Sequence, residues 1–204
     1  MKFNIYLTDE LQLIKHIENK LKSHPIKTYK YANVPYIRAG VLIPLFFKQG
    51  EPHILFTKRS DKVEHHKGQI AFPGGRYDDE DKDICETALR ETWEEMGIPG
   101  RDVKILGRTD DFLTNTNFMI TPYIGVITYP YYSNPNTDEI EDVYEIPLRT
   151  LIDPEIFEVK TLFRNGYNWK VHYYHCDNIL IWGVTGFLVS NFLSIVFNIN
   201  RMDL

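Results

Sequence analysis

Three glutamates lie close together in the segment RETWEEMGI, which covers residues 90–98. On a helix, at about 100° per residue, Glu94 falls near 300° and Glu95 near 40° when Glu91 is set to zero, so the three carboxylates share one face. Like charges at this spacing repel each other, and a hard divalent cation such as Mg²⁺ or Mn²⁺ would compensate them through oxygen ligands. The alternative is a solvated acidic face, which the glutamates taken alone favour.

A pair of glycines precedes this acidic helix, and an apolar side lies opposite the glutamates. The apolar side comprises Cys85, Leu89, Trp93 and Met96. We expect it to be buried, with the three carboxylates exposed. Gly74 and Gly75 would let a ligand approach the backbone closely. A Gly-Gly pair alone is most often a turn, but together with the acidic helix and a stop at Gly97 it forms a much narrower pattern.

This combination resembles the Nudix box, G-x5-E-x7-R-E-U-x-E-E-x-G-U, where U is apolar. Residues 90–98 match it nearly completely, with Thr92 at a position where an aliphatic residue is commoner. Upstream, the outer glutamate would fall on Lys82 and the glycine on Arg76, so the preceding segment is one residue longer than usual. Asp81 and Asp83 are the two candidates to replace that outer glutamate.

A second pattern resembles the signature of the coenzyme A pyrophosphatases within this superfamily, roughly LLTxRS-x3-R-x3-G-x3-FPGG. It consists of LFTKRS at residues 55–60 and HKGQIAFPGG at residues 66–75. Glu64 stands where an arginine is common. The longer spacing before Arg90 is also typical of that subfamily, and the whole resemblance covers about residues 35–195.

The resemblance implies a divalent metal site on the acidic helix. It assigns the innermost metal ligands to Glu91 and Glu95, with Glu94 as a further ligand or a proton acceptor. Arg90 is expected to orient the glutamates, because a guanidinium can hold carboxylates through two parallel hydrogen bonds. The expected cofactor is Mg²⁺ or Mn²⁺.

The catalytic base stays open among three glutamates. Glu94 is one candidate, and Glu139 and Glu141, which follow a Tyr/Pro/Asn-rich stretch, are the others. For each of the two loop glutamates, a solvated surface charge is the commoner role.

Donors for the substrate are expected upstream of the acidic helix. Arg59, His66 and Gln69 carry N–H groups suited to phosphate or adenine, and the backbone at Gly74 and Gly75 would approach the ligand. His66 is equally well explained as a polar residue beside a turn.

The implied enzyme splits the diphosphate of coenzyme A or its derivatives into 4′-phosphopantetheine (or its acyl form) and adenosine 3′,5′-bisphosphate. One alternative is a Nudix hydrolase that acts on ADP-ribose, NADH or another dinucleotide. A second is a non-catalytic module that binds a nucleotide. Three adjacent carboxylates argue against the second alternative, because a binder has no need for them.

Hydrophobic periodicity predicts the elements that position these residues. A helix over residues 9–22, capped by Thr8 or Asp9, comes first, and the acidic helix covers residues 82–96. A final helix is expected over residues 181–197. Strands are expected at residues 37–47, 53–57, 70–72, 102–107, 123–128 and 141–148, with a helical turn at 148–153 and a hairpin from 157–162 and 168–174.

These elements, mixed without regular alternation, indicate a mixed α/β sandwich. The resemblance implies an α+β protein with the Nudix fold, a mixed β-sheet core sandwiched between helices (α/β/α). Residues 1–34 are expected to form an N-terminal helical extension. The Nudix hydrolase domain should occupy residues 35–204, including the C-terminal helix.

Composition limits the partners and the compartment. The 204-residue chain has a formal net charge of −5 and no block of Lys and Arg, which argues against nucleic acid as a partner. Cys85 and Cys176 stand alone, as in a reducing compartment. The start of the chain is unlike a signal peptide, and polar residues interrupt the apolar stretch 179–197, so we expect a cytoplasmic protein without a membrane segment. The apolar final helix fits either the core or the contact surface of a homodimer.

Overall fold

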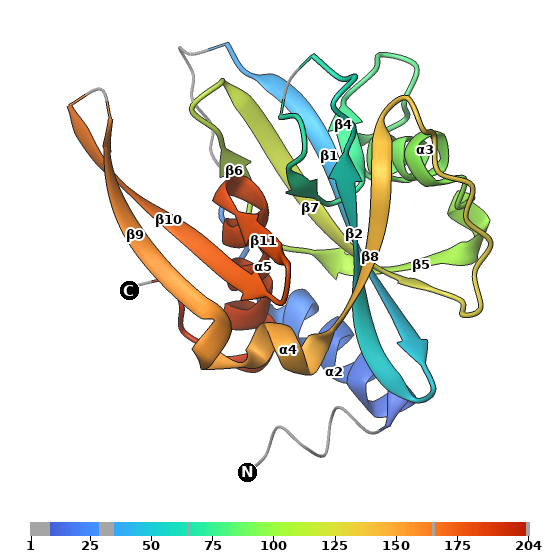
Figure 1. Cartoon of the computed structure of the whole chain (residues 1–204). Coiled ribbons are helices and arrows are strands. Elements are labelled where there is room, and N and C mark those ends of the chain that lie inside the picture. The colour runs from blue at the N-terminus through green and yellow to red at the C-terminus, as the bar shows by residue number, and fades with distance from the viewer. Residues whose placement is uncertain (1–8, 29–34, 65, 165, 203–204) are drawn as a thin grey trace.

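A mixed sheet forms the centre of the protein (Figure 1). The structure is a computed structural model, and it describes residues 9–28, 35–64, 66–164 and 166–202. The main path of the sheet runs β3–β2–β1–β7–β5, and three further strands pair beside it. The strands are β1 (Ile37–Lys48), β2 (Glu51–Arg59), β3 (Ile70–Ala71), β4 (Gly74–Arg76), β5 (Val103–Arg108), β6 (Phe112–Leu113), β7 (Phe118–Ile127) and β8 (Ile140–Pro147).

Strand β1 is the axis of this sheet. It pairs in parallel with β7, antiparallel with β2 across a tight turn, and antiparallel with β4. Its side chains alternate between two hydrophobic clusters: Leu42 and Phe46 belong to one, and Ile43 and Leu45 to the other. A strand covered on both faces reads as a continuous apolar run, which explains the sequence of residues 41–47.

Helices cover both faces of the sheet, so the predicted α/β/α sandwich is confirmed. Helix α3 (Ile84–Met96) packs on one face through Ala88 and Met96. The other face is covered by α2 (Glu10–Ser23) and α5 (Gly183–Phe197). Helix α2 begins after Asp9, whose side chain accepts a hydrogen bond from the backbone N–H of Gln12, as predicted; Thr8 lies outside the described residues.

A second, three-stranded sheet packs against α5. It consists of β9 (Phe157–Arg164), β10 (Tyr167–Cys176) and β11 (Ile179–Trp182) in the order β11–β10–β9. The turns α4 (Leu148–Ile152) and η2 (Pro154–Ile156) connect it to the main sheet. In Figure 1 the β9–β10 hairpin projects away from the body of the molecule.

Four predictions about the elements were wrong in detail. Residues 74–76 form β4, although no strand was predicted there. Glycine is rare in strands, so the residue types of this segment do not indicate one. Strand β7 begins at Phe118, five residues before the predicted start, and β6 was missed. The final helix begins at Gly183, because residues 179–182 pair as β11 with β10.

Helix α5 is mostly buried between the two sheets, so its apolar sequence belongs to the core. None of the described helices is long and apolar enough to cross a membrane.

Candidate active site

Helix α3 has well-defined ends, which fix the rotation of its glutamates. Asp83 caps the first turn, where its side chain accepts from the N–H of Glu86. Gly97 ends the helix in the left-handed region with φ of 70°, and its N–H donates to the carbonyl of Trp93. A side chain is unfavourable in that conformation, so the glycine fits its position.

The buried side of α3 differs from the predicted one. Glu95 is buried, with an exposed fraction of 2%, whereas Trp93 is 53% exposed. The helix turns Ala88 toward β1, where an added Cβ on Gly40 would lie 2.9 Å from the backbone nitrogen of Ala88. This close backbone contact places Glu95 against the sheet and moves Trp93 into solvent. The expectation that all three carboxylates are exposed is therefore wrong for Glu95 and also for Glu91, whose side chain is only 17% exposed; Glu94 alone of the three is exposed.

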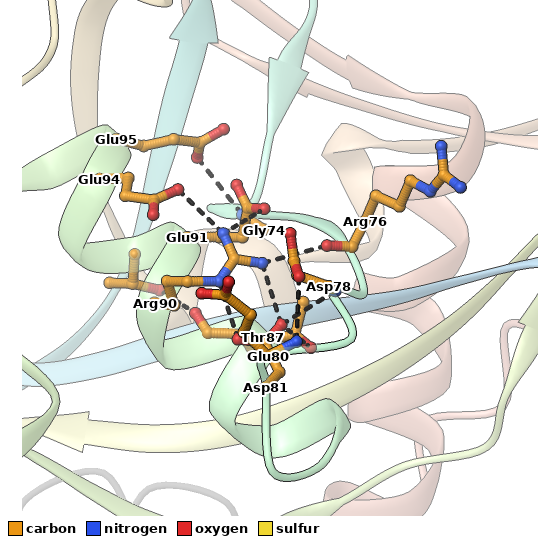
Figure 2. A network of polar contacts seen from close by, with 12 residues as sticks. Gly74, Arg76, Asp78, Glu80, Asp81, Thr87, Arg90, Glu91, Glu94 and Glu95 are labelled. Carbon is orange, nitrogen blue, oxygen red and sulfur yellow. Dashed lines mark hydrogen bonds and ion pairs between the residues drawn. The ribbon is translucent and has the colours of Figure 1, made fainter.

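Arg90 is the centre of the polar network on this helix (Figure 2). Its Nη1 donates to Glu91 Oε1 and Glu94 Oε2, both at 2.9 Å. Its Nε and Nη2 donate to the two oxygens of Asp81 at 2.8 and 3.0 Å. Nη2 also donates to the carbonyl of Arg76 at 3.1 Å. One guanidinium thus holds two of the three glutamates and the segment that precedes the helix.

Asp81 anchors this guanidinium from the loop before α3. It is buried, and it also accepts a hydrogen bond from Thr87 Oγ1 at 2.8 Å. The hydrogen bonds from Arg90 lower the pKa of Asp81 to about 2, against the opposing effect of burial. Of the two aspartates considered for the outer position of the box, Asp81 contacts Arg90, and Asp83 caps the helix.

Glu95 has much weaker compensation for its charge. Its Oε2 accepts from the N–H of Gly74 at 3.3 Å, and its Oε1 lies 3.6 Å from Arg59 Nη1. Burial is the main cause that raises the pKa of Glu95 to about 8, and the negative charge of Glu91 adds to it. Burial also raises the pKa of Glu91, against the opposing effect of Arg90. A buried carboxylate this poorly paired is a typical sign of a functional site.

The glycines of β4 bring its backbone directly against the acidic helix. A Cβ on Gly75 would lie 2.5 Å from both carboxylate oxygens of Glu91. Gly74 donates its N–H to Glu95 and pairs with Val41 of β1. Both glycines thus lie against the glutamates, and the close approach of a ligand to their backbone stays a prediction.

The loop before β8 brings Glu139 to the same site. The backbone carbonyl of Glu139 accepts from Ser60 N–H at 2.7 Å, directly after Arg59. The negative charge of Glu139 contributes to the raised pKa of both Glu91 and Glu95. The sequence analysis missed Asn136, which bonds both to α3 and to Glu139. The local spacing N-x-D-E could have indicated it, because asparagine commonly accepts a hydrogen bond from the N–H two residues on.

Four other polar residues lie outside the Arg90 network. His66 Nδ1 and Gln69 Oε1 bond each other at 2.9 Å in the loop between β2 and β3. Glu141 accepts from Lys58 Nζ at 2.7 Å and is exposed. Glu64, which replaces a common arginine, is also exposed.

The carboxylates fit a divalent cation by their chemistry, although their present orientations do not. Among the described side chains, no three His, Cys, Asp or Glu groups are arranged so that they could hold a metal ion. Glu91 and Glu94 both face Arg90 Nη1, so a cation would compete with that guanidinium for their oxygens. The buried and weakly paired carboxylate of Glu95 is the feature that favours a cation, since positive charge there would offset its desolvation.

The acidic helix α3 is thus held against the Gly-Gly strand β4 on a mixed α/β/α sheet. Comparison with known proteins identifies the family. The NUDIX domain model matches residues 36–165. Relatives named "Uncharacterized Nudix hydrolase NudL", from Yersinia pestis and Yersinia pseudotuberculosis, are 35% identical over 156 residues, which cover 76% of this chain and 77% of theirs.

Solved structures also resemble this chain, at low sequence identity. A Caenorhabditis elegans Ap4A hydrolase has a TM-score of 0.48 and 17% identity, and the match covers 57% of this chain and 83% of that one. The NUDIX domain of Shewanella oneidensis NrtR, in complex with ADP ribose, also has a TM-score of 0.48, with 16% identity over 61% of this chain and 81% of that one.

The chain belongs to the NUDIX domain family. It is a Nudix hydrolase, an enzyme that hydrolyses phosphoric anhydrides in small nucleotide substrates, generally with divalent metal ions.

Proposed function

We propose that this Nudix hydrolase cleaves the diphosphate of coenzyme A or its derivatives, releasing 4′-phosphopantetheine (or its acyl form) and adenosine 3′,5′-bisphosphate. The paired match of residues 55–60 and 66–75 to the coenzyme A pyrophosphatase signature carries the proposal. In support, these segments are neighbours: β2 pairs with β3, and Arg59 N–H donates to the carbonyl of Gln69 at 3.0 Å. Arg59 from one segment and Gly74 from the other both contact Glu95.

We assign the metal site to Glu91, Glu94 and Glu95, with Mg²⁺ or Mn²⁺ as the ion. When bound, such a cation supplies positive charge to the diphosphate oxygens, where negative charge develops as the anhydride breaks. Arg90 has an orienting role in this scheme. Asp81 fixes its guanidinium through a hydrogen bond, and the guanidinium in turn donates to Glu91 and Glu94.

Arg59 is the donor best placed to bind a phosphate. Its Nε is buried and has no hydrogen-bond partner in the part of the chain that the structure describes, while Nη1 faces Glu95. A buried donor without an acceptor costs free energy, which an incoming phosphate oxygen would recover. The backbone of Gly74 and Gly75 lines the same region. His66 and Gln69 stay proposed substrate contacts. They lie together on the loop between β2 and β3, where they bond each other.

Glu139 and Glu94 are our two candidates for the group that accepts the proton from the attacking water. Glu94 is half exposed, and its Oε2 is occupied by a hydrogen bond from Arg90 Nη1. Among the described residues, the Glu139 carboxylate accepts from Asn136 Nδ2 and forms no ion pair, and its negative charge acts on Glu91 and Glu95. We therefore favour Glu139.

The test is product identification with purified enzyme and either Mg²⁺ or Mn²⁺. We expect coenzyme A to give adenosine 3′,5′-bisphosphate, detected by chromatography and mass spectrometry, and no turnover without a divalent ion. ADP-ribose and NADH, the alternatives that Glu64 leaves open, serve as competing substrates. Intact coenzyme A beside rapid turnover of ADP-ribose would overturn the substrate assignment.

We further propose a cytoplasmic enzyme that acts on a small molecule and not on nucleic acid. The net charge of −5 and two free cysteines support this assignment. A homodimer stays a prediction, for which light scattering of the purified enzyme is the direct measurement.

A further inference from the structure

The loop that carries Glu139 is fastened to the acidic helix through one residue. Asn136 donates its backbone N–H to the carbonyl of Glu95 at 2.9 Å. Its own carbonyl accepts from the N–H groups of Glu139 at 3.0 Å and Ile140 at 2.7 Å. Its side chain donates from Nδ2 to Glu139 Oε1 at 3.1 Å and accepts at Oδ1 from Asp138 N–H at 3.1 Å.

These contacts require the amide of asparagine. Oδ1 faces an N–H donor and Nδ2 faces a carboxylate, so only one orientation of the amide satisfies both partners. Aspartate or serine could also accept from Asp138 N–H, and both are common in such turns. Neither could donate an amide N–H to Glu139. The turn alone therefore does not explain why residue 136 is an asparagine. The hydrogen bond from its amide to the Glu139 carboxylate does.

We propose that Asn136 is a positioning residue of this Nudix hydrolase, which holds the Glu139 carboxylate beside the glutamates of α3. This inference rests on the proposed role of Glu139 at the reaction site. The backbone bonds of Asn136 fix the distance between the loop and the helix, and its side chain fixes the direction of the Glu139 carboxylate. Asn136 acts through Glu139 and needs no contact with the substrate.

Two variants remove the amide N–H donor to Glu139 and keep an oxygen that can accept from Asp138 N–H; the serine hydroxyl is one bond shorter than the amide it replaces. Asn136→Asp has the same shape, and Asn136→Ser adds no charge. We expect each to lower kcat about 10-fold, the value for a hydrogen bond to a charged group, with KM changed less than about 2-fold. Asn134→Asp is the matched control on the same loop, because Asn134 is exposed and only its backbone N–H bonds to α3, at Met96. It should retain kcat within about 2-fold.

A double-mutant cycle separates positioning from general damage to the loop. In a Glu139→Gln background, Asn136→Ser should lower kcat by less than about 2-fold, because its effect runs through Glu139. An equal loss of kcat in both backgrounds would show a merely structural role and overturn the inference. The assays use whichever of coenzyme A, ADP-ribose and NADH the wild type hydrolyses fastest, so a wrong substrate assignment leaves this comparison intact.

Hydrogen exchange gives a readout without substrate. The amides of residues 134, 136, 139 and 140 should be protected in the wild type and stay protected in Asn136→Ser, since their acceptors are backbone carbonyls. Rapid exchange of the amide of residue 136 in the wild type would show that the loop is not docked on α3, and would overturn the inference whatever the activity.

Discussion

Arg90 neutralises two glutamates of α3, while Glu95 depends on a long hydrogen bond and a distant guanidinium. Three side chains of one type on one helix therefore have different electrostatic environments. Burial decides the difference, because a carboxylate removed from water needs close partners to stay charged. The box motif in the sequence groups the three glutamates, but only the packing of α3 on β1 distinguishes them.

Glu95→Gln tests that difference. We expect hydrolysis to fall about 100-fold or more, because the variant removes a proposed metal ligand. The melting temperature of the metal-free protein should not fall, since glutamine keeps the volume and replaces a buried carboxyl whose ionisation burial already disfavours. Steady-state kinetics and calorimetry measure the two effects. Glu141→Gln, on an exposed glutamate bonded to Lys58, is the control with expected wild-type activity. Full activity in Glu95→Gln would refute the metal site.

Asp81→Asn should reveal the acid-sensitive part of the site. The folded-state pKa of Asp81 is about 2, below its ordinary value near 4, so the ionised form stabilises the fold above pH 4 and this contribution is lost as the pH falls toward 2. We expect the variant to be about 2 kcal/mol less stable at pH 7 and nearly equal to the wild type at pH 2. Urea titrations across this range measure the difference, and a gap that does not change with pH would contradict the assignment.

At the scale of the elements, β4 packs closely against α3 because Gly75 has no side chain. Gly75 lies so close to Glu91 that any Cβ would displace the carboxylate. The short strand was not predicted, because two glycines read as a turn, whereas its pairing with β1 is a tertiary effect. The ends of α3 were easier to predict, because its cap at Asp83 and its stop at Gly97 are local signals.

Gly75→Ala should therefore impair catalysis more than folding. We expect kcat/KM to fall about 10-fold or more while the melting temperature changes by only a few degrees, since the flexible Glu91 side chain can move away. Gly100→Ala is a matched control, because its Cβ would meet Leu89 at an ordinary 3.5 Å. A Gly75→Ala enzyme with wild-type kinetics would show that the position of Glu91 does not matter.

At the scale of the whole molecule, Asp110 joins three segments that are far apart in the sequence. It accepts from His24 Nε2 at 2.7 Å, from Lys27 N–H at 2.8 Å and from Asn191 Nδ2 at 3.2 Å. Burial alone would raise the pKa of Asp110, but these hydrogen bonds outweigh it and lower the pKa. Helix α2 is thus tied to the main sheet and to α5 by one carboxylate on the far side from α3.

Asp110→Ala should destabilise the protein without changing the reaction. The buried donors left behind predict a loss of about 2–4 kcal/mol in the free energy of unfolding. We expect kcat/KM to stay within about 2-fold below the melting temperature, since Asp110 bonds none of the proposed site residues. Chemical denaturation and kinetics on the same preparation measure both. A large loss of activity in the folded variant would mean that the two faces of the sheet are coupled.

The sequence predicted the class of the molecule better than its pairings. The box and the Gly-Gly segment identified the acidic helix, because their chemistry requires fixed spacings. The parallel pairing of β1 with β7, the rotation of α3 and the link through Asn136 were not predicted. Each of these joins segments that are distant in the sequence, and only the packed core brings them together.

All three tryptophans lie at the surface: Trp93, Trp169 and Trp182 are 53%, 46% and 38% exposed. The native protein should therefore fluoresce near the wavelength of indole in water and respond to soluble quenchers. Its emission would shift little as the core melts, so the denaturation experiments above are better followed by circular dichroism or calorimetry. Trp93, on the same helix as Arg90 and its glutamates, would be the natural optical reporter of events at that helix.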